Sequence, residues 1–271
     1  MFVIQCYCMG KIKGLPDIIE YSDELNDEFS IAKIEARKID DNYRYHPKTI
    51  FGKFFSSLLY RLVAIPVSWF YMKSKFHHKI KGKKLLKKGK KTGYFIYGNH
   101  TQIIGDAFMP CRISHPKKSA VIVHANNVSM PGLKRIVPAL GAMPLPDTPK
   151  AASNFTNEIN RRIKKRQAIF IYPEAHLWPY YTHIRPFKDT SFTYPVSLKV
   201  PVYCFVNTYK KRKNPNKCQI ITRIRGPFYP DESLSSKEAI KKLRDEVYNN
   251  MVELSGYSDV ELIKYVKKES K

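Results

Sequence analysis

The sequence has little cysteine, and its cysteines follow no binding pattern. The five cysteines among 271 residues are odd in number and scattered along the chain. This excludes a disulfide framework and a zinc site built on paired cysteines. Cys6 and Cys8 form an isolated C-x-C, which we interpret as reduced structural thiols rather than as metal ligands. We therefore expect a reducing cytosolic environment, no metal site and no cofactor.

Signatures of several other protein classes are also missing. The apolar run at residues 1–9 lacks a basic leader and a small-residue cleavage site, so it is not typical of a secretory signal. We find no zinc finger, ribonucleoprotein motif or basic zipper, and we therefore expect no nucleic-acid partner. A basic nucleic-acid-binding protein stays open as an alternative, because the net charge is +25 and the 18 tyrosines could stack on bases.

Acidic residues are scarce, and their distribution divides the chain. Asp and Glu number 23 against 48 Lys and Arg, so the protein would attract a polyanion such as an anionic bilayer or an acidic carrier protein. Residues 1–49 hold nine of the acids and seven of the bases. We therefore predict an acidic N-terminal arm over residues 1–49, which either folds back on the basic remainder or extends into solvent.

One stretch, residues 51–72, is a candidate for membrane contact. Arg61 in its middle and Pro66 argue against a comfortable transmembrane span and favour an interfacial helix. The apolar side chains recur at steps of three and four, which places them on one helical face. They are Phe51, Phe54, Phe55, Leu58, Leu59, Leu62 and Val63.

A polybasic run follows this stretch and strengthens the membrane interpretation. Ten lysines lie between residues 73 and 91, and each base near an anionic surface contributes about 1 kcal/mol of binding. We predict that residues 50–79 form an amphipathic docking helix and basic segment on an anionic membrane surface. A core helix of a soluble domain is the alternative.

Beyond this segment, strand-like and helix-like patterns alternate. Residues 150–165 and 237–254 carry apolar stripes at helical spacing, and Ser235 or Ser236 is the expected cap of the second helix. This alternation predicts an α/β fold with a mixed, largely parallel β-sheet flanked by helices, preceded by the interfacial helix. The apolar or β-branched runs of strand length are residues 94–97, 120–124, 168–172, 200–206 and 218–224.

The first motif with chemical content follows the strand predicted at residues 94–97. It reads Asn99-His100-Thr101-Gln102-Ile103-Ile104-Gly105-Asp106. A strand end is where α/β sheets place their chemistry. A histidine is the natural base for a hydroxyl proton near neutral pH, and a carboxylate can fix its tautomer and stabilise the imidazolium. The pair suits acyl transfer to an alcohol.

Further motifs stand downstream in a fixed order. Tyr172-Pro173-Glu174-Ala175-His176 ends another apolar strand, and Pro186-Phe187-Lys188-Asp189-Thr190-Ser191-Phe192 and Lys199-Val200-Pro201-Val202-Tyr203 follow it. Together with the first motif, this order resembles the lysophospholipid (1-acylglycerol-3-phosphate) acyltransferase family, in which N-H-x4-D, P-E-G-T-R, P-F-K-x-G-x-F and V-P-x-x-P-V blocks succeed one another. Ile80-Lys81-Gly82 matches the glycine-bearing turn of the family's lead-in, and the likeness extends to Leu254.

The resemblance implies a glycerolipid acyltransferase domain over residues 80–271 that acts in phospholipid biosynthesis. His100 would be the general base and Asp106 its orienting partner, while Glu174 would position the acceptor or shape the site. The acyl donor would be acyl-CoA or acyl-carrier protein, the default acceptor 1-acylglycerol-3-phosphate, and the location the cytoplasmic face of a membrane, peripheral or monotopic. A non-catalytic lipid-binding relative is the alternative.

The chain departs from the family pattern where the acceptor would bind. Asp106 stands one residue later than in the family, and we expect Gly105 to absorb the extra residue as a bulge with positive φ. Asp147 and the Ala175-His176-Leu177 run replace family positions that carry phosphate-binding arginines. Candidates to compensate, which are otherwise surface or structural residues, are His176, Arg185, Lys188, Lys134 and Arg135.

Overall fold

The computed structural model describes residues 14–29, 34–214 and 217–268. Cys6 and Cys8 lie outside these ranges. In the described part of the chain, the main sheet has seven strands in the order β2-β8-β7-β3-β6-β4-β5, and all neighbours are parallel except β7 and β8. The strands are β2 (Lys79–Lys81), β3 (Tyr94–Gly98), β4 (Ser119–Val123), β5 (Ala142–Pro144), β6 (Ala168–Ile171), β7 (Val202–Lys211) and β8 (Cys218–Phe228).

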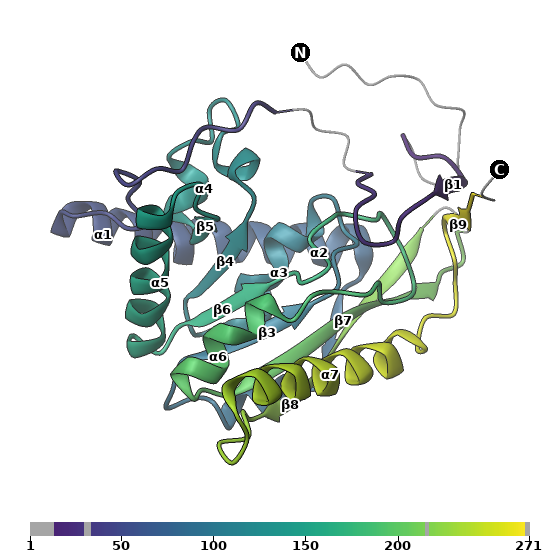
Figure 1. Ribbon diagram of the computed structural model, residues 1–271. Helices are drawn as coiled ribbons and strands as arrows, with labels where there is room; N and C mark the ends of the chain where they lie inside the picture. The colour runs from purple at the N-terminus through teal and green to yellow at the C-terminus, as the bar shows by residue number, and fades with distance from the viewer. Residues whose placement is uncertain (1–13, 30–33, 215–216, 269–271) are drawn as a thin grey trace.

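Helices cover both faces of this sheet, which gives three layers (Figure 1). The side chains of β3 explain the arrangement, since Phe95 and Tyr97 enter one apolar cluster and Tyr94 and Ile96 enter the other. The first cluster includes α5 (Pro149–Lys164) and α7 (Ser236–Ser255), with α6 (Thr193–Leu198) beside it. The second includes α2 (Ile65–Phe76) and α3 (Gly105–Ser114), and the short α4 (Ile136–Ala139) leads into β5.

This architecture confirms the predicted fold class. The five strand-like runs became β3, β4, β6, β7 and β8, and the two helical stripes became α5 and α7. Ser235 caps α7, because its hydroxyl accepts from the amide of Glu238 while the Glu238 carboxylate accepts from the amide of Ser235. Gly82 ends β2 in the left-handed region, at φ 80°, as a glycine-bearing turn requires.

The N-terminal helix runs without a break from Ile50 to Phe76, and its middle is a π-helical segment between α1 (Ile50–Leu58) and α2. The π turns at Leu59–Ala64 precede Pro66, so the proline stands near the start of a new α-helical segment, where it is tolerated. Figure 1 shows α1 projecting from the edge of the domain. At 27 residues, the helix is long and apolar enough to meet the length and composition of a membrane span.

The described parts of the acidic arm pack on the domain instead of extending into solvent. Ile39 and Tyr45 belong to the apolar cluster under α5. The amide of Ile39 donates to Asp147 at 2.7 Å, and the hydroxyl of Tyr45 donates to the carbonyl of Pro144. β1 (Ile18–Tyr21) also pairs in parallel with β9 (Lys264–Lys267), so the arm is tied to the chain's C-terminal region.

Candidate active site

The backbone around His100 is held by groups from the neighbouring strand. β3 lies between β6 and β7, and the loops after β3 and β6 meet because the two strands run parallel. The amide of His100 donates to Glu174 Oε2 at 3.0 Å, and its carbonyl accepts from the amide of Trp178 at 3.1 Å. The loop after β6 therefore fixes the main chain of His100 on both sides.

The side chains of His100 and Asp106 are in direct contact. His100 Nδ1 lies 2.8 Å from Asp106 Oδ2, and the same oxygen accepts from the amides of Thr101 and Gln102, each at 2.9 Å. The His100 side chain is 26% exposed and that of Asp106 is 3% exposed. Burial raises the pKa of Asp106, while the hydrogen bonds from His100 and from the two amides act in the opposite direction.

The extra residue in this motif is accommodated differently from our expectation. Gly105 does not have positive φ, so the prediction of a glycine bulge is wrong. Gly105 is instead the first residue of α3, and the added residue lies in the turn at 101–104. The Asp106 carboxylate accepts the amides of that turn, which closes it without a left-handed residue.

Glu174 and Arg185 form a buried pair behind His100. Glu174 Oε2 lies 3.6 Å from Arg185 Nη2, and both side chains are fully buried. The guanidinium of Arg185 also donates to the carbonyls of Glu24 and His176 and stacks over Trp178. Burial raises the pKa of Glu174, and the charge of Arg185 counteracts this. Both predicted substrate ligands thus contact protein groups in this structure, and Glu174 holds the main chain of His100 through its amide.

The other predicted ligands lie at the surface. His176 Nδ1 is 2.9 Å from Glu28 Oε2, a residue of the acidic arm. Lys188, Lys134 and Arg135 are exposed, the first on the loop after β6 and the other two just before α4. Of the five candidate cations, Arg185 and His176 are joined by a hydrogen bond, and among the described residues no contact joins the other three to them.

Sequence reasoning missed three polar contacts of the site, all made by residues distant in sequence. The ring of Tyr172 stacks on that of His100 with centroids 4.8 Å apart, and its hydroxyl donates to the carbonyl of Asp106. The side-chain amide of Asn207 donates to Asp106 Oδ1 at 3.3 Å. Tyr209 contacts Thr101, with 2.6 Å between the two hydroxyls. The one signal of these contacts in the sequence is that the polar residues Asn207 and Thr208 directly follow the apolar run of β7.

This geometry leaves one ring nitrogen of His100 available for proton transfer. Nδ1 is engaged by Asp106, which fixes the tautomer with the proton on Nδ1. Among the described residues, no protein group is hydrogen-bonded to Nε2. The lone pair of Nε2 can therefore accept a proton from a bound molecule.

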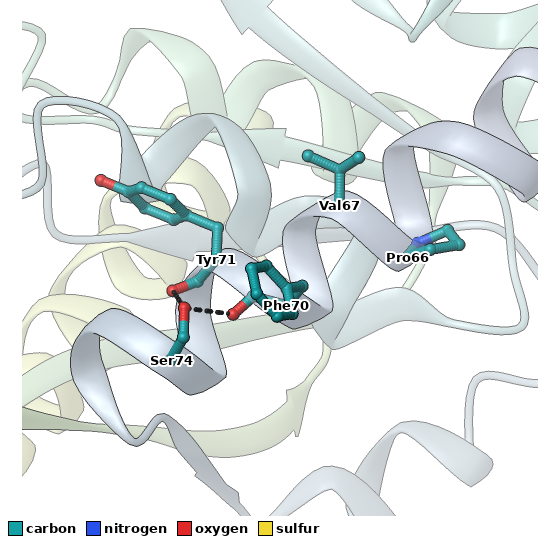
Figure 2. A pocket seen from close by; sticks show the side chains of 5 residues that line it. All are labelled: Pro66, Val67, Phe70, Tyr71 and Ser74. Atoms are coloured by element: carbon teal, nitrogen blue, oxygen red, sulfur yellow. Dashed lines mark hydrogen bonds between the residues drawn. The ribbon is translucent and has the colours of Figure 1, made fainter.

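An apolar pocket lies on the outer side of α2 (Figure 2). Its volume is about 430 Å³, and it is lined by Pro66, Val67, Phe70, Tyr71 and Ser74. The ring of Tyr71 contacts that of Phe108, with centroids 5.2 Å apart, and Phe108 lies two residues after Asp106 on α3. The pocket and the His100 site are thus linked through α3.

Comparison with known proteins decides the family. The family model described as Acyltransferase matches residues 77–207, which include His100, Asp106 and Glu174. Residues 77–207 of this chain thus form an acyltransferase domain. Its fold matches the crystal structure of the 1-acyl-sn-glycerophosphate (LPA) acyltransferase PlsC from Thermotoga maritima, with a TM-score of 0.53 and 17% identity over 77% of this chain and 89% of that chain.

The family model confirms the predicted acyltransferase domain, and the structural match confirms that the fold is that of a glycerolipid acyltransferase. A search of curated protein sequences found no match to this acyltransferase. Among the described residues, no cluster of three or more His, Cys, Asp or Glu side chains is arranged to hold a metal ion.

Proposed function

We propose that this acyltransferase moves a fatty acyl group from acyl-CoA or acyl-carrier protein to a hydroxyl of a lysophospholipid-type acceptor, 1-acylglycerol-3-phosphate by default. The observation that carries the proposal is the 2.8 Å contact of His100 Nδ1 with buried Asp106, with the ring partly exposed just after the carboxyl end of β3. A base of this kind suits the removal of a proton from an alcohol.

The reaction follows from that contact. Nε2 of His100 takes the proton of the acceptor hydroxyl as its oxygen bonds to the thioester carbonyl carbon. The tetrahedral intermediate then collapses, the carbon–sulfur bond breaks, and the imidazolium returns the proton to the thiolate. An ester and a free thiol are formed. Asp106 holds the ring and stabilises the imidazolium between the two proton transfers.

The acceptor's head group must be bound by residues other than Arg185. Arg185 is buried against Glu174, and so it supports the loop instead of binding phosphate. The remaining cations on candidate positions are Lys188, Lys134 and Arg135, all exposed. We propose that a phosphorylated acceptor is bound by one of these surface cations and not by the arginine fork that the family provides.

We further propose that the enzyme works at the cytoplasmic face of a membrane, as a peripheral or monotopic protein. The helix at residues 50–76 turns large apolar side chains outward, among them Phe51 at 85% and Phe70 at 68% exposed. An exposed apolar surface of this kind is typical of a lipid-binding face. We propose that the apolar pocket on this helix receives part of an acyl chain.

A thiol-release assay tests the function directly. Purified protein is incubated with acyl-CoA or acyl-carrier protein and with a panel of phosphorylated and neutral lysolipids, and the free thiol and the ester product are both measured. Wild-type protein should form product with at least one acceptor, and His100→Ala should lose at least about 10³-fold in kcat. The exposed His183→Ala serves as the matched control and should keep full activity.

The same assay separates the enzyme from a non-catalytic lipid-binding relative. A wild-type protein that binds lysolipid vesicles but releases thiol no faster than His100→Ala would support the relative and sink the proposed reaction.

A further inference from the structure

A row of polar side chains crosses the apolar layer beneath α2 and α3. Asn207 on β7 and Thr222 on β8 face each other in antiparallel register, and both are fully buried. A cross-strand pair shares one face of the sheet. The neighbours on this face are Phe205, Tyr209, Ile220 and Ile224, all members of the apolar cluster.

The hydrogen bonds of this row have a fixed direction. Thr222 Oγ1 lies 2.6 Å from Asn207 Oδ1, and its hydroxyl must donate there because an amide oxygen can only accept. The hydroxyl oxygen is then free to accept from His78 Nε2 at 2.7 Å. His78 Nδ1 in turn accepts from Arg112 at 3.4 Å. Because the Asn207 amide oxygen accepts from Thr222, the amide nitrogen points to Asp106.

The row ends on the oxygen of Asp106 that does not contact His100. Oδ2 of Asp106 accepts from His100 and two backbone amides, whereas Oδ1 accepts from Asn207 at 3.3 Å. In the described part of the chain, Asn207 is the one protein donor to Oδ1. A carboxylate held on both oxygens cannot rotate about its Cβ–Cγ bond without breaking a hydrogen bond.

Packing alone does not account for these polar residues. Burying an amide or hydroxyl in an apolar layer is unfavourable unless every group is paired, and apolar side chains of similar shape would fill the same space. The row runs through His78, Thr222 and Asn207 and ends at Asp106. The row of hydrogen bonds thus leads to the candidate catalytic pair, which suggests that it serves the position of Asp106.

We propose that Asn207 is a positioning residue that sets the plane of the Asp106 carboxylate, and that Thr222 and His78 set the orientation of the Asn207 amide. This inference rests on the proposed function, because the orientation of Asp106 matters only if His100 is the base. Asn207 itself contacts no reacting atom.

Substitutions at Thr222 test this row of hydrogen bonds at a residue that contacts neither His100 nor Asp106. Thr222→Val keeps the shape but removes the hydroxyl, so the Asn207 amide can turn and kcat should fall at least 10-fold while KM stays within about twofold. Thr222→Ser restores the hydroxyl and should recover more than half of kcat. Thr208→Val is the matched control, since Thr208 is the next residue of β7, is equally buried and hydrogen-bonds only away from Asp106.

A spectroscopic readout makes the test independent of turnover. The Nδ1–H proton of His100 should give a downfield resonance in wild type, Thr222→Ser and Thr208→Val, and this resonance should shift or broaden in Thr222→Val and Asn207→Leu. Wild-type kcat and an unchanged resonance in Thr222→Val, or equal losses in Thr208→Val, would overturn the inference. If wild type itself transfers no acyl group, the proposed function fails, and the resonance still decides whether Asn207 positions the pair.

Discussion

Among single residues, His78 is a buried imidazole beside two cations. It is 3% exposed, and Arg112 and Lys83 lie nearby. Burial first, and then the charges of Arg112 and Lys83, lower the pKa of His78 to about 3. An unfolded histidine binds a proton near pH 6.5, so between about pH 6.5 and pH 3 the unfolded chain holds more protons than the folded one. The free energy of unfolding should therefore decrease as the pH falls through this range.

The substitution His78→Gln tests this linkage. A glutamine can still donate to Thr222 but cannot titrate, so the fall in stability with pH should be shallower. Between pH 7 and pH 4.5, wild type should lose about 2 kcal/mol more of its unfolding free energy than the variant, by urea denaturation at each pH. His183→Gln, at an exposed position, is the control. Equal losses in wild type and His78→Gln would contradict the linkage.

The residue after Glu174 explains one departure from the family pattern. Ala175 has φ 62°, in the left-handed region that favours glycine, and it stands where P-E-G-T-R has its glycine. The backbone shape of the turn is thus kept while the side chain changes. The arginine of that block has no counterpart at Leu177, which is buried.

Among the elements, the N-terminal helix differs from a core helix because most of its large apolar side chains face away from the domain. Over residues 50–70 the side chains that face the domain are largely polar, since Ser56 donates to the carbonyl of Ala139 and Tyr60 is hydrogen-bonded to Ser119. Met72 and Phe76, at the end of the helix, enter the apolar cluster beneath it. Large apolar side chains face outward, among them Phe51, Phe54, Phe55, Leu62 and Phe70. Such a helix is stabilised by a second apolar medium, which fits the proposed membrane surface.

The triple variant Phe51→Ser, Phe54→Ser, Phe55→Ser should weaken vesicle binding without unfolding the domain. Each ring that leaves the bilayer costs about 1.5–3 kcal/mol, so the partition coefficient should fall at least 100-fold. Thermal unfolding in the absence of lipid should change little, because the three rings are exposed. Sedimentation with vesicles measures the first and calorimetry the second. Unchanged vesicle binding would show that this face serves another purpose.

The elements that sequence analysis predicted are those long enough to carry a pattern. Apolar runs gave β3, β4, β6, β7 and β8, but β2 and β5 have three residues each and show no periodicity. Within the site, His100 and Asp106 could be paired because they share one motif. Tyr172 and Asn207 join them only through strand adjacency, which fixes contacts across 66 and 101 residues. The sequence contains no local signal of that adjacency.

At the scale of the whole molecule, the net charge of +25 makes any attraction to anionic lipid depend on salt. Lys53, Arg61 and Lys73 are exposed on the N-terminal helix, next to its outward apolar side chains. Each base near an anionic surface contributes about 1 kcal/mol. Binding to vesicles with phosphatidylserine should therefore weaken as salt rises from 50 to 500 mM, while binding to neutral vesicles should change little.

Charge reversal separates a docking face from a general effect of net charge. The variant Lys53→Glu, Arg61→Glu, Lys73→Glu should bind anionic vesicles at least 10-fold less tightly at 50 mM salt. The control Lys199→Glu, Lys237→Glu, Lys241→Glu has the same net charge, but its substitutions lie at the end of α6 and on α7, in the layer opposite α2. Because screening confines each charge to within about 10 Å, the control should bind nearly as wild type does. Equal losses in both variants would mean that the molecule has no oriented membrane face.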